Sequence, residues 1–167
     1  MKINVSKILK NQDSSMEFDG EVRLKDFVYM GSNIHIGLPV KVKALITNLE
    51  DHLYMKGNLK AELMPECSRC LQTFKYKMDV DFEEELSNKD AEEDRDDVLY
   101  FEGDFVDLTE IIENNILLSL PMKFLCRKDC KGLCPHCGAN LNLGKCKCTN
   151  KEIDPRLSVL GDFFKSN

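Results

Sequence analysis

Cysteine is the residue type with the most chemistry to offer in this chain of 167 residues. Six of the eight cysteines lie between Cys126 and Cys148, and the other two, Cys67 and Cys70, lie far upstream. Cysteines in Cys-x-x-Cys pairs bind metal ions, exchange disulfides or form stable cross-links. The N-terminal sequence MKINVSKILKNQD has no apolar signal segment, so we expect a cytoplasmic, reducing location. Metal binding or redox work is then favoured over structural disulfides.

The strongest pattern is CPHCG at residues 134–138, which is typical of a zinc knuckle. Two cysteines three residues apart in a tight turn direct both sulfurs at one metal. The glycine that follows permits the backbone conformation that aims N–H groups at those sulfurs. A second pair comes after a short loop, as CKC. The sequence therefore predicts a tetrahedral zinc site made of Cys134, Cys137, Cys146 and Cys148.

The four remaining cysteines are Cys67, Cys70, Cys126 and Cys130. If they share a second zinc ion, that site clamps the upstream segment to the C-terminal module. This set follows only from what is left once the first site is assigned. The sequence therefore leaves open whether the chain binds one zinc ion or two, and which cysteines share a metal.

Redox and catalytic uses of the cysteines fit the sequence less well. A thioredoxin-like pair sits at a helix N-terminus, which lowers the thiol pKa, whereas Cys70 is followed by LQTF, a strand-like segment. A catalytic zinc keeps one position open and commonly uses His or carboxylate ligands. His136 fits a spacer between ligands, and His35 and His52 have no partner pattern.

Motifs of known enzyme classes are not found in the sequence. It contains no glycine-rich phosphate loop, no Ser/His/Asp order and no HExxH. The carboxylates of residues 81–97 are too dense and too far from apolar anchors to form a paired acid/base site. A nuclease is the most plausible enzyme, but the residues favour a protein that is not an enzyme.

Charge is distributed unevenly along the chain. The net charge of -6 argues against binding nucleic acid with the whole surface. Residues 81–97 hold ten acidic side chains and two basic ones, whereas residues 123–151 hold seven basic and one acidic. The cysteine-rich end is therefore also the basic end. The candidates for phosphate contacts are Lys123, Arg127, Lys128, Lys131, Lys145 and Lys147.

The elements that must position these residues can be read from hydrophobic periodicity. Apolar residues alternate with polar ones in 40–47, 53–63 and 74–82, which predicts an antiparallel sheet with one packed and one wet face. Residues 16–20 suggest a further strand, and residues 6–10 a helical turn. Asp107 and Glu110 form a capping box that starts a helix to about Ser119. Its apolar stripe should dock on the sheet through Leu108, Ile111, Ile112, Ile116 and Leu120.

Together these elements predict an α+β fold with five parts. They are a β-rich half (1–86), an acidic linker (87–97), a short strand plus a core-packing helix (98–125), a cysteine-rich zinc module (126–150), and a C-terminal helix or tail (151–167). The longest apolar stretch, at 116–120, is far too short to cross a membrane, so no membrane association is expected.

Several segments together resemble a bacterial protein family. These are CSRCL (67–71), DLTEIIENNILLSLP (107–121), CRKDCKGLCPHCGANLN (126–142), CKC (146–148) and DPRLSVL (154–160). In order and spacing they are similar to the YceD-like large ribosomal RNA subunit accumulation proteins, from about residue 60 to the end. The resemblance implies a non-enzymatic role in ribosome assembly or rRNA processing. Some members of that family lack most of the C-terminal cysteines, which implies that the metal stabilises the fold.

Two functional hypotheses follow from the charge pattern and the resemblance. In the first, the basic zinc end binds precursor ribosomal RNA or an early large-subunit assembly particle. In the second, the chain is an adaptor that holds a basic ribosomal protein through its acidic strip or its open sheet face. An RNA partner predicts strong salt dependence, and a protein partner predicts binding that survives nuclease treatment.

Overall fold

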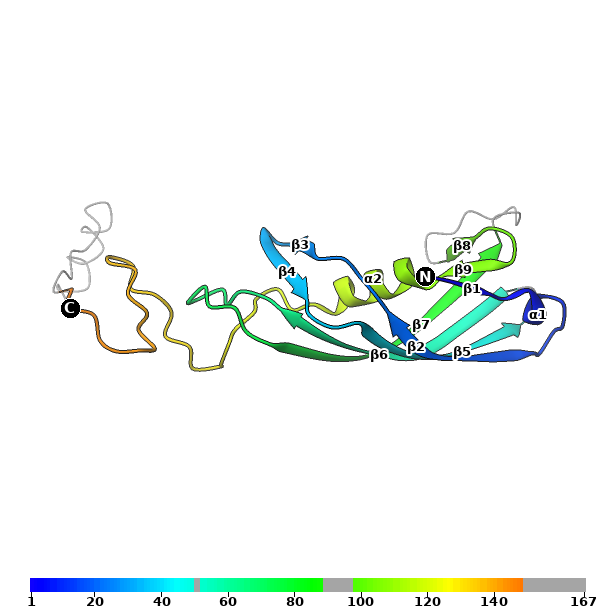
Figure 1. The fold of residues 1–167 in the computed structure, drawn as a ribbon, viewed down its shortest axis with the longest axis horizontal. Helices are drawn as coiled ribbons and strands as arrows, with labels where there is room; N and C mark the ends of the chain where they lie inside the picture. Colours follow the sequence, from blue (N-terminus) through cyan, green and yellow to red (C-terminus); the bar gives the residue numbers. More distant parts are fainter. Residues whose placement is uncertain (50–51, 89–97, 149–167) are drawn as a thin grey trace, which may run out of the picture.

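A computed structural model describes residues 1–49, 52–88 and 98–148, and Figure 1 shows its elongated shape. Most of the predicted acidic linker and the whole predicted C-terminal helix at 151–167 lie outside the described residues. The described part is rich in strands and contains two helices, which confirms the α+β class. The cysteine-rich module extends from one end of the sheet, toward the C-terminus in Figure 1.

One long, curved and mainly antiparallel sheet forms the body of the molecule (Figure 1). β5 (Val40–Leu49) and β6 (His52–Met64) are antiparallel neighbours, and β7 (Tyr76–Asn88) pairs with β6 along nearly all of its length. β2 (Ser15–Val22) pairs with β5 on one side. β8 (Leu99–Phe101) pairs in parallel with the end of β7 on the other.

The period-two pattern decides which face of the sheet is buried. In β5 the side chains of Val40, Val42 and Ile46 are fully buried, while Lys41 and Lys43 point to solvent. β6 and β7 continue this pattern in register, so that apolar side chains from three adjacent strands share one face. Burying them contributes roughly 25 cal/mol for each Å² of apolar surface removed from water. The apolar inner face is therefore the main source of stability of the sheet.

Helix α2 (Leu108–Ser119) covers the inner face of the sheet, as Figure 1 shows. The carboxylate of Asp107 accepts a hydrogen bond from the N–H of Thr109 at 2.9 Å and so caps the helix. Glu110 makes no described hydrogen bond back to Asp107, so only the aspartate half of the predicted capping box is formed. All members of the predicted apolar stripe are buried: Leu108, Ile111, Ile112, Ile116 and Leu120.

Short elements complete the fold. β1 (Lys2–Asn4) pairs with β9 (Phe105–Asp107), and the helical turn expected at residues 6–10 is α1 (Ser6–Leu9). β3 (Phe27–Tyr29) and β4 (Ser32–Ile36) form a hairpin that the hydrophobic pattern does not predict. The hairpin joins the sheet because β4 pairs with the end of β6.

The turn residues of the β3–β4 hairpin also carry no hairpin signal in the sequence. Its two-residue turn has Met30 at φ 49° and Gly31 at φ 81°, and such turns favour Asn-Gly or Asp-Gly at these positions. Beyond the turn, the ring of Tyr29 contacts the edge of Phe124, with 6.3 Å between ring centroids. The hairpin thereby packs on the segment that leads from α2 to the cysteines.

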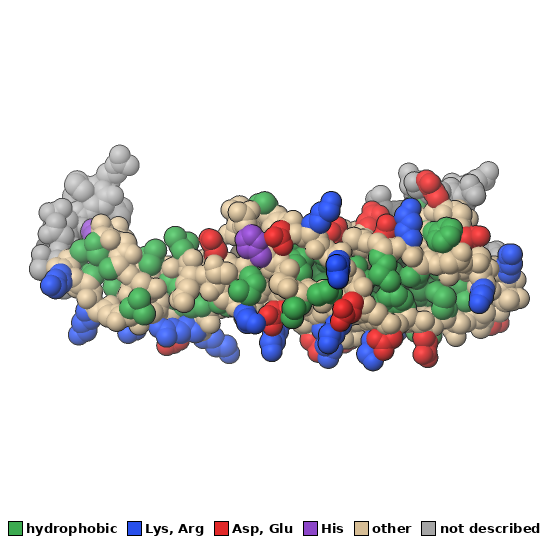
Figure 2. Space-filling model, in the orientation of Figure 1, with side chains coloured by type: hydrophobic (Ala, Val, Ile, Leu, Met, Phe, Trp, Pro, Cys, Tyr) green, Lys and Arg blue, Asp and Glu red, His purple; other side chains and the backbone are tan. Residues whose placement is uncertain are grey.

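The outer face of the sheet carries paired charges. Lys43 lies 2.9 Å from Asp19, Lys60 lies 2.9 Å from Asp79, and Lys56 pairs with Glu83. Figure 2 shows blue and red side chains alternating along this surface. Exposed pairs stabilise proteins by at most about 1 kcal/mol each, so their main effect here is to compensate charge across adjacent strands.

Part of the predicted acidic region is therefore strand. β7 continues to Asn88, two residues beyond the boundary expected at 86, because its last residues pair with β8. The predicted linker 87–97 thus begins inside a strand. Of the ten carboxylates in 81–97, those of Asp81 and Glu83 face side chains of β6: Asp81 accepts from Asn58 at 2.8 Å, and Glu83 pairs with Lys56.

Candidate metal centres

The structure brings the eight cysteines together in two groups of four. The inner site consists of Cys67, Cys70, Cys126 and Cys130, and the outer site consists of Cys134, Cys137, Cys146 and Cys148. Within each group all four sulfurs lie within 4.8 Å of one another, and no cysteine of the chain is in a disulfide. Each group could hold a metal ion. The inner site joins the loop between β6 and β7 to the C-terminal module, so it spans about sixty residues of chain.

The spacing of the sulfurs fits a tetrahedral zinc ion. A zinc–sulfur bond of about 2.3 Å in a regular tetrahedron places neighbouring sulfurs about 3.8 Å apart. Sulfur–sulfur distances are 3.8 Å from Cys67 to Cys130, 3.7 Å from Cys70 to Cys126, and 3.5 Å from Cys134 to Cys146. Four thiolates with no carboxylate or water ligand are the donor set of closed, structural zinc sites. The residues at both sites therefore fit zinc.

Both Cys-x-x-Cys loops have the same backbone geometry. In each loop the N–H of the residue after the second cysteine donates to the first cysteine's carbonyl at 2.9 Å: Leu71 to Cys67, and Gly138 to Cys134. The N–H of the first cysteine donates to the carbonyl five residues later, and an isolated bridge closes each loop. The two loops are thus equivalent knuckles, although only the second has the glycine that the sequence pattern favours.

Backbone N–H groups favour the thiolate at the first cysteine of each knuckle. Burial opposes ionisation of Cys67, but N–H groups of Cys126, Arg69 and Cys70 outweigh it and lower its pKa to about 6. At the outer site, N–H groups of Cys137 and His136 lower the pKa of Cys134 to about 6. The thiolate is the form that binds metal ions.

One cysteine of the second pair at each site, Cys126 at the inner site and Cys148 at the outer site, holds its proton more strongly. Burial, together with the neighbouring sulfurs of Cys130, Cys67 and Cys70, raises the pKa of Cys126 to about 12. The sulfur of Cys137 is the main cause that raises the pKa of Cys148 to about 12. Four sulfurs packed this closely cannot all be ionised without a compensating cation, which is what a bound zinc ion supplies.

The inner site is also tied together by direct contacts between its two halves. The Arg69 guanidinium donates to the carbonyl of Cys130 at 2.7 Å, and the N–H of Leu133 donates to the carbonyl of Arg69 at 3.1 Å. Gly132, at φ 75°, passes so close that a Cβ atom would lie 2.9 Å from that same carbonyl oxygen. Only glycine satisfies both the backbone angle and the close approach at this point.

The two sites differ in exposure. At the inner site Cys67, Cys70 and Cys130 are buried and only Cys126 is half-buried. At the outer site Cys137 and Cys148 are exposed. The inner site is therefore shielded from solvent, and the outer site is accessible to it.

The predicted basic residues all lie on the surface of the cysteine-rich end. Figure 2 shows blue side chains gathered along the lower side of this end. Arg127 is engaged, because its guanidinium donates to Asn142 at 2.6 Å and lies 3.5 Å from Asp129. Within the described residues the other five have no ion pair; they are Lys123, Lys128, Lys131, Lys145 and Lys147. Two zinc tetrathiolates would add about four negative charges, which is less than the excess of six positive charges in residues 123–151, so this end keeps a positive balance.

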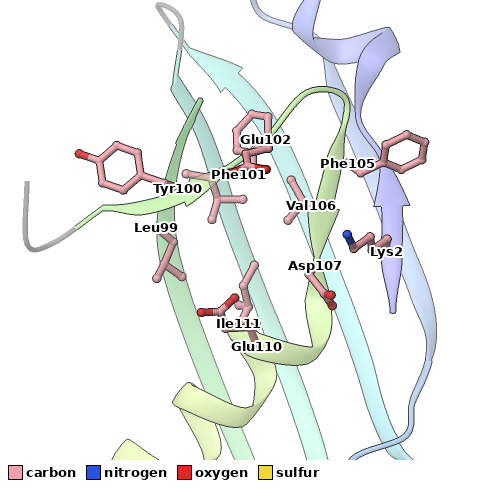
Figure 3. A pocket seen from close by; sticks show the side chains of 11 residues that line it. Lys2, Leu99, Tyr100, Phe101, Glu102, Phe105, Val106, Asp107, Glu110 and Ile111 are labelled. Carbon is pink, nitrogen blue, oxygen red and sulfur yellow. The ribbon is translucent and has the colours of Figure 1, made fainter. Parts of the chain in front are cut away.

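A separate hollow of about 300 Å³ lies at the opposite end of the molecule, between β8, β9 and the start of α2. Figure 3 shows Tyr100 and Phe105 pointing away from each other on opposite sides, with Phe101 and Val106 between them. Of its carboxylates, Asp107 is already used as the cap of α2. No serine, cysteine or histidine is among the described residues that line the hollow.

The fold and the cysteines together define an α+β protein with a curved antiparallel sheet and a cysteine-rich module that is suited to metal. A family profile described as "Large ribosomal RNA subunit accumulation protein YceD" matches residues 55–164. The match covers both knuckles, α2, most of β6 and all of β7 and β8. The chain belongs to this family, which confirms the resemblance seen in the sequence.

Relatives of this chain occur in bacteria and plants. An uncharacterized protein of Bacillus subtilis, YlbN, is 28% identical over 100% of this chain and 98% of its own length. A chloroplastic large ribosomal RNA subunit accumulation protein YCED homolog 1 of Arabidopsis thaliana is 34% identical over 75% of this chain and 49% of its own length. The homologue of that name from Zea mays is 37% identical over 46% of this chain and 27% of its own length. No solved structure matches.

Neither helix in the described part of the chain has the length and apolar character needed to cross a bilayer.

Proposed function

We propose that this chain is a non-enzymatic ribosome biogenesis factor that supports the accumulation of large-subunit ribosomal RNA by binding precursor rRNA or an early assembly particle. Its site of action is the cytoplasm. The observation that carries the proposal is its membership of a family named for that accumulation. The plant relatives, which bear the same name, are consistent with it.

Zinc at both sites is part of the proposal. The inner ion clamps the module to the sheet, and the outer ion shapes the loop that carries Lys145 and Lys147. The metal here holds the chain in shape, because both sites have four sulfur donors and leave no position open for a substrate.

The basic residues are the proposed RNA contacts. Lys123, Lys128, Lys131, Lys145 and Lys147 are exposed and have no described ion pair, so they are available to phosphate oxygens. Arg127 is held in place by Asn142 and presents its remaining donors from a fixed position. Contacts of this kind supply affinity and position, not sequence selectivity.

Charge reversal tests the RNA interface. Replacing Lys128, Lys131 and Lys147 together by glutamate should weaken binding to a large-subunit rRNA fragment. It should also lower the slope of log affinity against log salt by about 2 to 3, since each lost phosphate contact removes roughly one unit. Binding would be followed by fluorescence anisotropy at several salt concentrations.

The matched control reverses three exposed lysines elsewhere, Lys7, Lys10 and Lys25, with the same change in net charge. It should leave the salt slope as it is in the unsubstituted chain. An affinity that falls equally in both variants would show a general charge effect and would refute the proposed interface.

The adaptor hypothesis has weaker support from the structure. The carboxylates on the outer face of β7 are compensated by β6, with Lys60 paired to Asp79 and Lys56 to Glu83. They are therefore less available to a basic protein than their number in the sequence suggests. A ribosomal protein that stays bound after complete nuclease digestion would favour the adaptor over the RNA-binding role.

A further inference from the structure

Asn142 lies in the outer site's loop but contacts the inner site. In the chain it sits between Cys137 and Cys146, which are ligands of the outer site. Its side-chain amide nitrogen, Nδ2, donates to the sulfur of Cys130, an inner-site ligand, at 3.3 Å. One side chain thus connects the loop of one centre to a ligand of the other.

Every hydrogen-bonding group of the Asn142 amide is used. Its oxygen accepts from the backbone N–H of Lys131 at 2.8 Å and from the guanidinium of Arg127 at 2.6 Å. Its nitrogen also donates to the side-chain oxygen of Asn140 at 2.8 Å. This network fixes which end of the amide faces Cys130, because only the NH₂ end can donate to a sulfur.

The backbone reinforces the same connection. The N–H of Leu141 donates to the carbonyl of Gly132 at 2.9 Å, and the N–H of Asn142 donates to the side chain of Asn140 at 2.9 Å. Residues 140–142 of the outer loop therefore lie against residues 130–132, the end of the inner half-site. The contact is a continuous patch and not a single hydrogen bond.

The hydrogen bond from Asn142 to the sulfur of Cys130 should strengthen metal binding at the inner site. Groups that hydrogen-bond to metal ligands orient those ligands, and their loss typically lowers metal affinity 10–100-fold. The donor can act only if its loop is ordered, and metal-binding loops of this kind order when the metal binds. A metal at the outer site holds both ends of the loop, at Cys137 and Cys146, and so places Asn142 in advance.

We propose that Asn142 couples the two centres, so that a metal ion bound at the outer site strengthens metal binding at the inner site. The inference rests on the metal binding proposed above. Coupling of this kind is reciprocal, so inner-site metal also strengthens the outer site. Because the outer cysteines are the exposed ones, metal is lost there first, and that loss loosens the clamp between the module and the sheet.

The test uses the full chain loaded with cadmium, whose NMR spectrum gives a separate resonance for each site. Titration with a competing chelator then yields an affinity for each site. Asn142→Asp keeps the shape of the side chain but replaces the donor that faces Cys130 with an oxygen. We expect it to lower inner-site affinity about 10-fold or more. Asn142→Ala, which adds no charge, should lower it as well.

Leu143→Asp is the matched control. Leu143 is the next residue in the same loop and is 89% exposed, so the substitution adds the same charge without contact with Cys130. It should leave the inner-site affinity unchanged. The circular dichroism of the sheet, measured for each variant, shows that the body of the protein is folded.

Disabling the outer site completes a thermodynamic cycle. The double substitution Cys137→Ser with Cys148→Ser should also lower the metal affinity of the inner site. In that background, Asn142→Asp should lower the inner-site affinity much less than it does in the intact chain. Strictly additive effects, or an inner affinity unchanged by Asn142→Asp, would overturn the coupling while leaving two independent metal sites. A chain that binds no metal at all would overturn the metal assignment as well, so the two failures are distinguishable.

Discussion

At the scale of single residues, Leu71 occupies a position that suits glycine. It follows the second cysteine of the inner knuckle with φ 58°, as Gly138 follows that of the outer knuckle with φ 71°. A left-handed backbone costs a leucine roughly 1 kcal/mol more than it costs glycine, and this side chain is 61% exposed, so little packing is lost on its removal.

Leu71→Gly should therefore stabilise the metal-loaded protein by about 1 kcal/mol, measured by urea denaturation. The control is Leu143→Gly, at an exposed position without a positive φ, which should give no gain. Equal effects of the two substitutions would mean that strain at Leu71 is negligible.

Asp107 gives the protein a predictable response to acid. The α-amino group of Met1 and the N–H of Thr109 both hydrogen-bond to this carboxylate and lower its pKa below the usual 3.8. A carboxylate with a depressed pKa stabilises the fold above its unfolded-state pKa and loses that effect as the pH falls through the folded-state value. Its contribution is thus complete at neutral pH and fades below about pH 4.

Asp107→Asn keeps a side-chain oxygen for the cap but removes the charge. It should be less stable than the unsubstituted chain at pH 7, and the difference should shrink as the pH falls below about 4. Thermal unfolding at a series of pH values measures this. Asp104→Asn, at an exposed position in the preceding turn, is the control and should leave the shape of the profile as it was.

At the scale of elements, the curved sheet depends on one close approach. Gly57 in β6 faces inward, and a Cβ atom there would lie 2.5 Å from the carbonyl oxygen of Lys43 and 2.9 Å from the ring of Phe82. The ring of Phe82 packs over the space that a side chain would fill. Because one obstacle is backbone, the strands would have to move apart to accept even a methyl group.

Gly57→Ala should destabilise the protein by about 1 to 3 kcal/mol in urea denaturation. Gly37→Ala is the matched control, because the nearest atom to its Cβ would be a Met64 side-chain carbon at 4.0 Å. If both substitutions had the same small effect, the close approach at Gly57 would not be a constraint on the sheet.

The elements that the sequence predicted well are those with long, regular patterns. Alternation over eight to eleven residues identified β5, β6 and β7, and the apolar stripe identified α2. One short strand was expected in 98–125, where β8 and β9 lie. The sequence did not reveal β1, β3 or β4, because strands of three to five residues are too short to show a period. The end of β7 was misplaced because its last residues are polar yet pair with β8.

At the scale of the whole molecule, the candidate metal sites lie outside the main core. The main apolar core lies between the sheet and α2, while Cys67, Cys70 and Cys130 form a second buried cluster. Leu133 packs on this second cluster, and Phe74 packs on both. Loss of metal should therefore unfold the module and spare the sheet.

Native mass spectrometry under reducing conditions should show two zinc ions per chain, and a strong chelator should remove both. Amide hydrogen exchange should then accelerate in residues 126–148 while the strands β5 to β7 keep their protection. Incubation with reductant alone is the control, and it should change neither the zinc content nor the exchange rates. Collapse of the whole sheet on chelation would show that the module and the core fold as one unit.

The sequence by itself determined the types of the candidate metal ligands, the spacing of the knuckles, the buried faces of the long strands and the helix stripe, because each is encoded within a few neighbouring residues. It also carried the motifs that identify the family. Only the tertiary structure decided which sulfurs meet, since Cys67 and Cys130 lie 3.8 Å apart although sixty-three positions separate them in the chain. The same holds for Asn142, Arg69 and Gly57, whose importance comes from contacts with distant segments. Nothing in the type or local spacing of these three residues encodes those contacts.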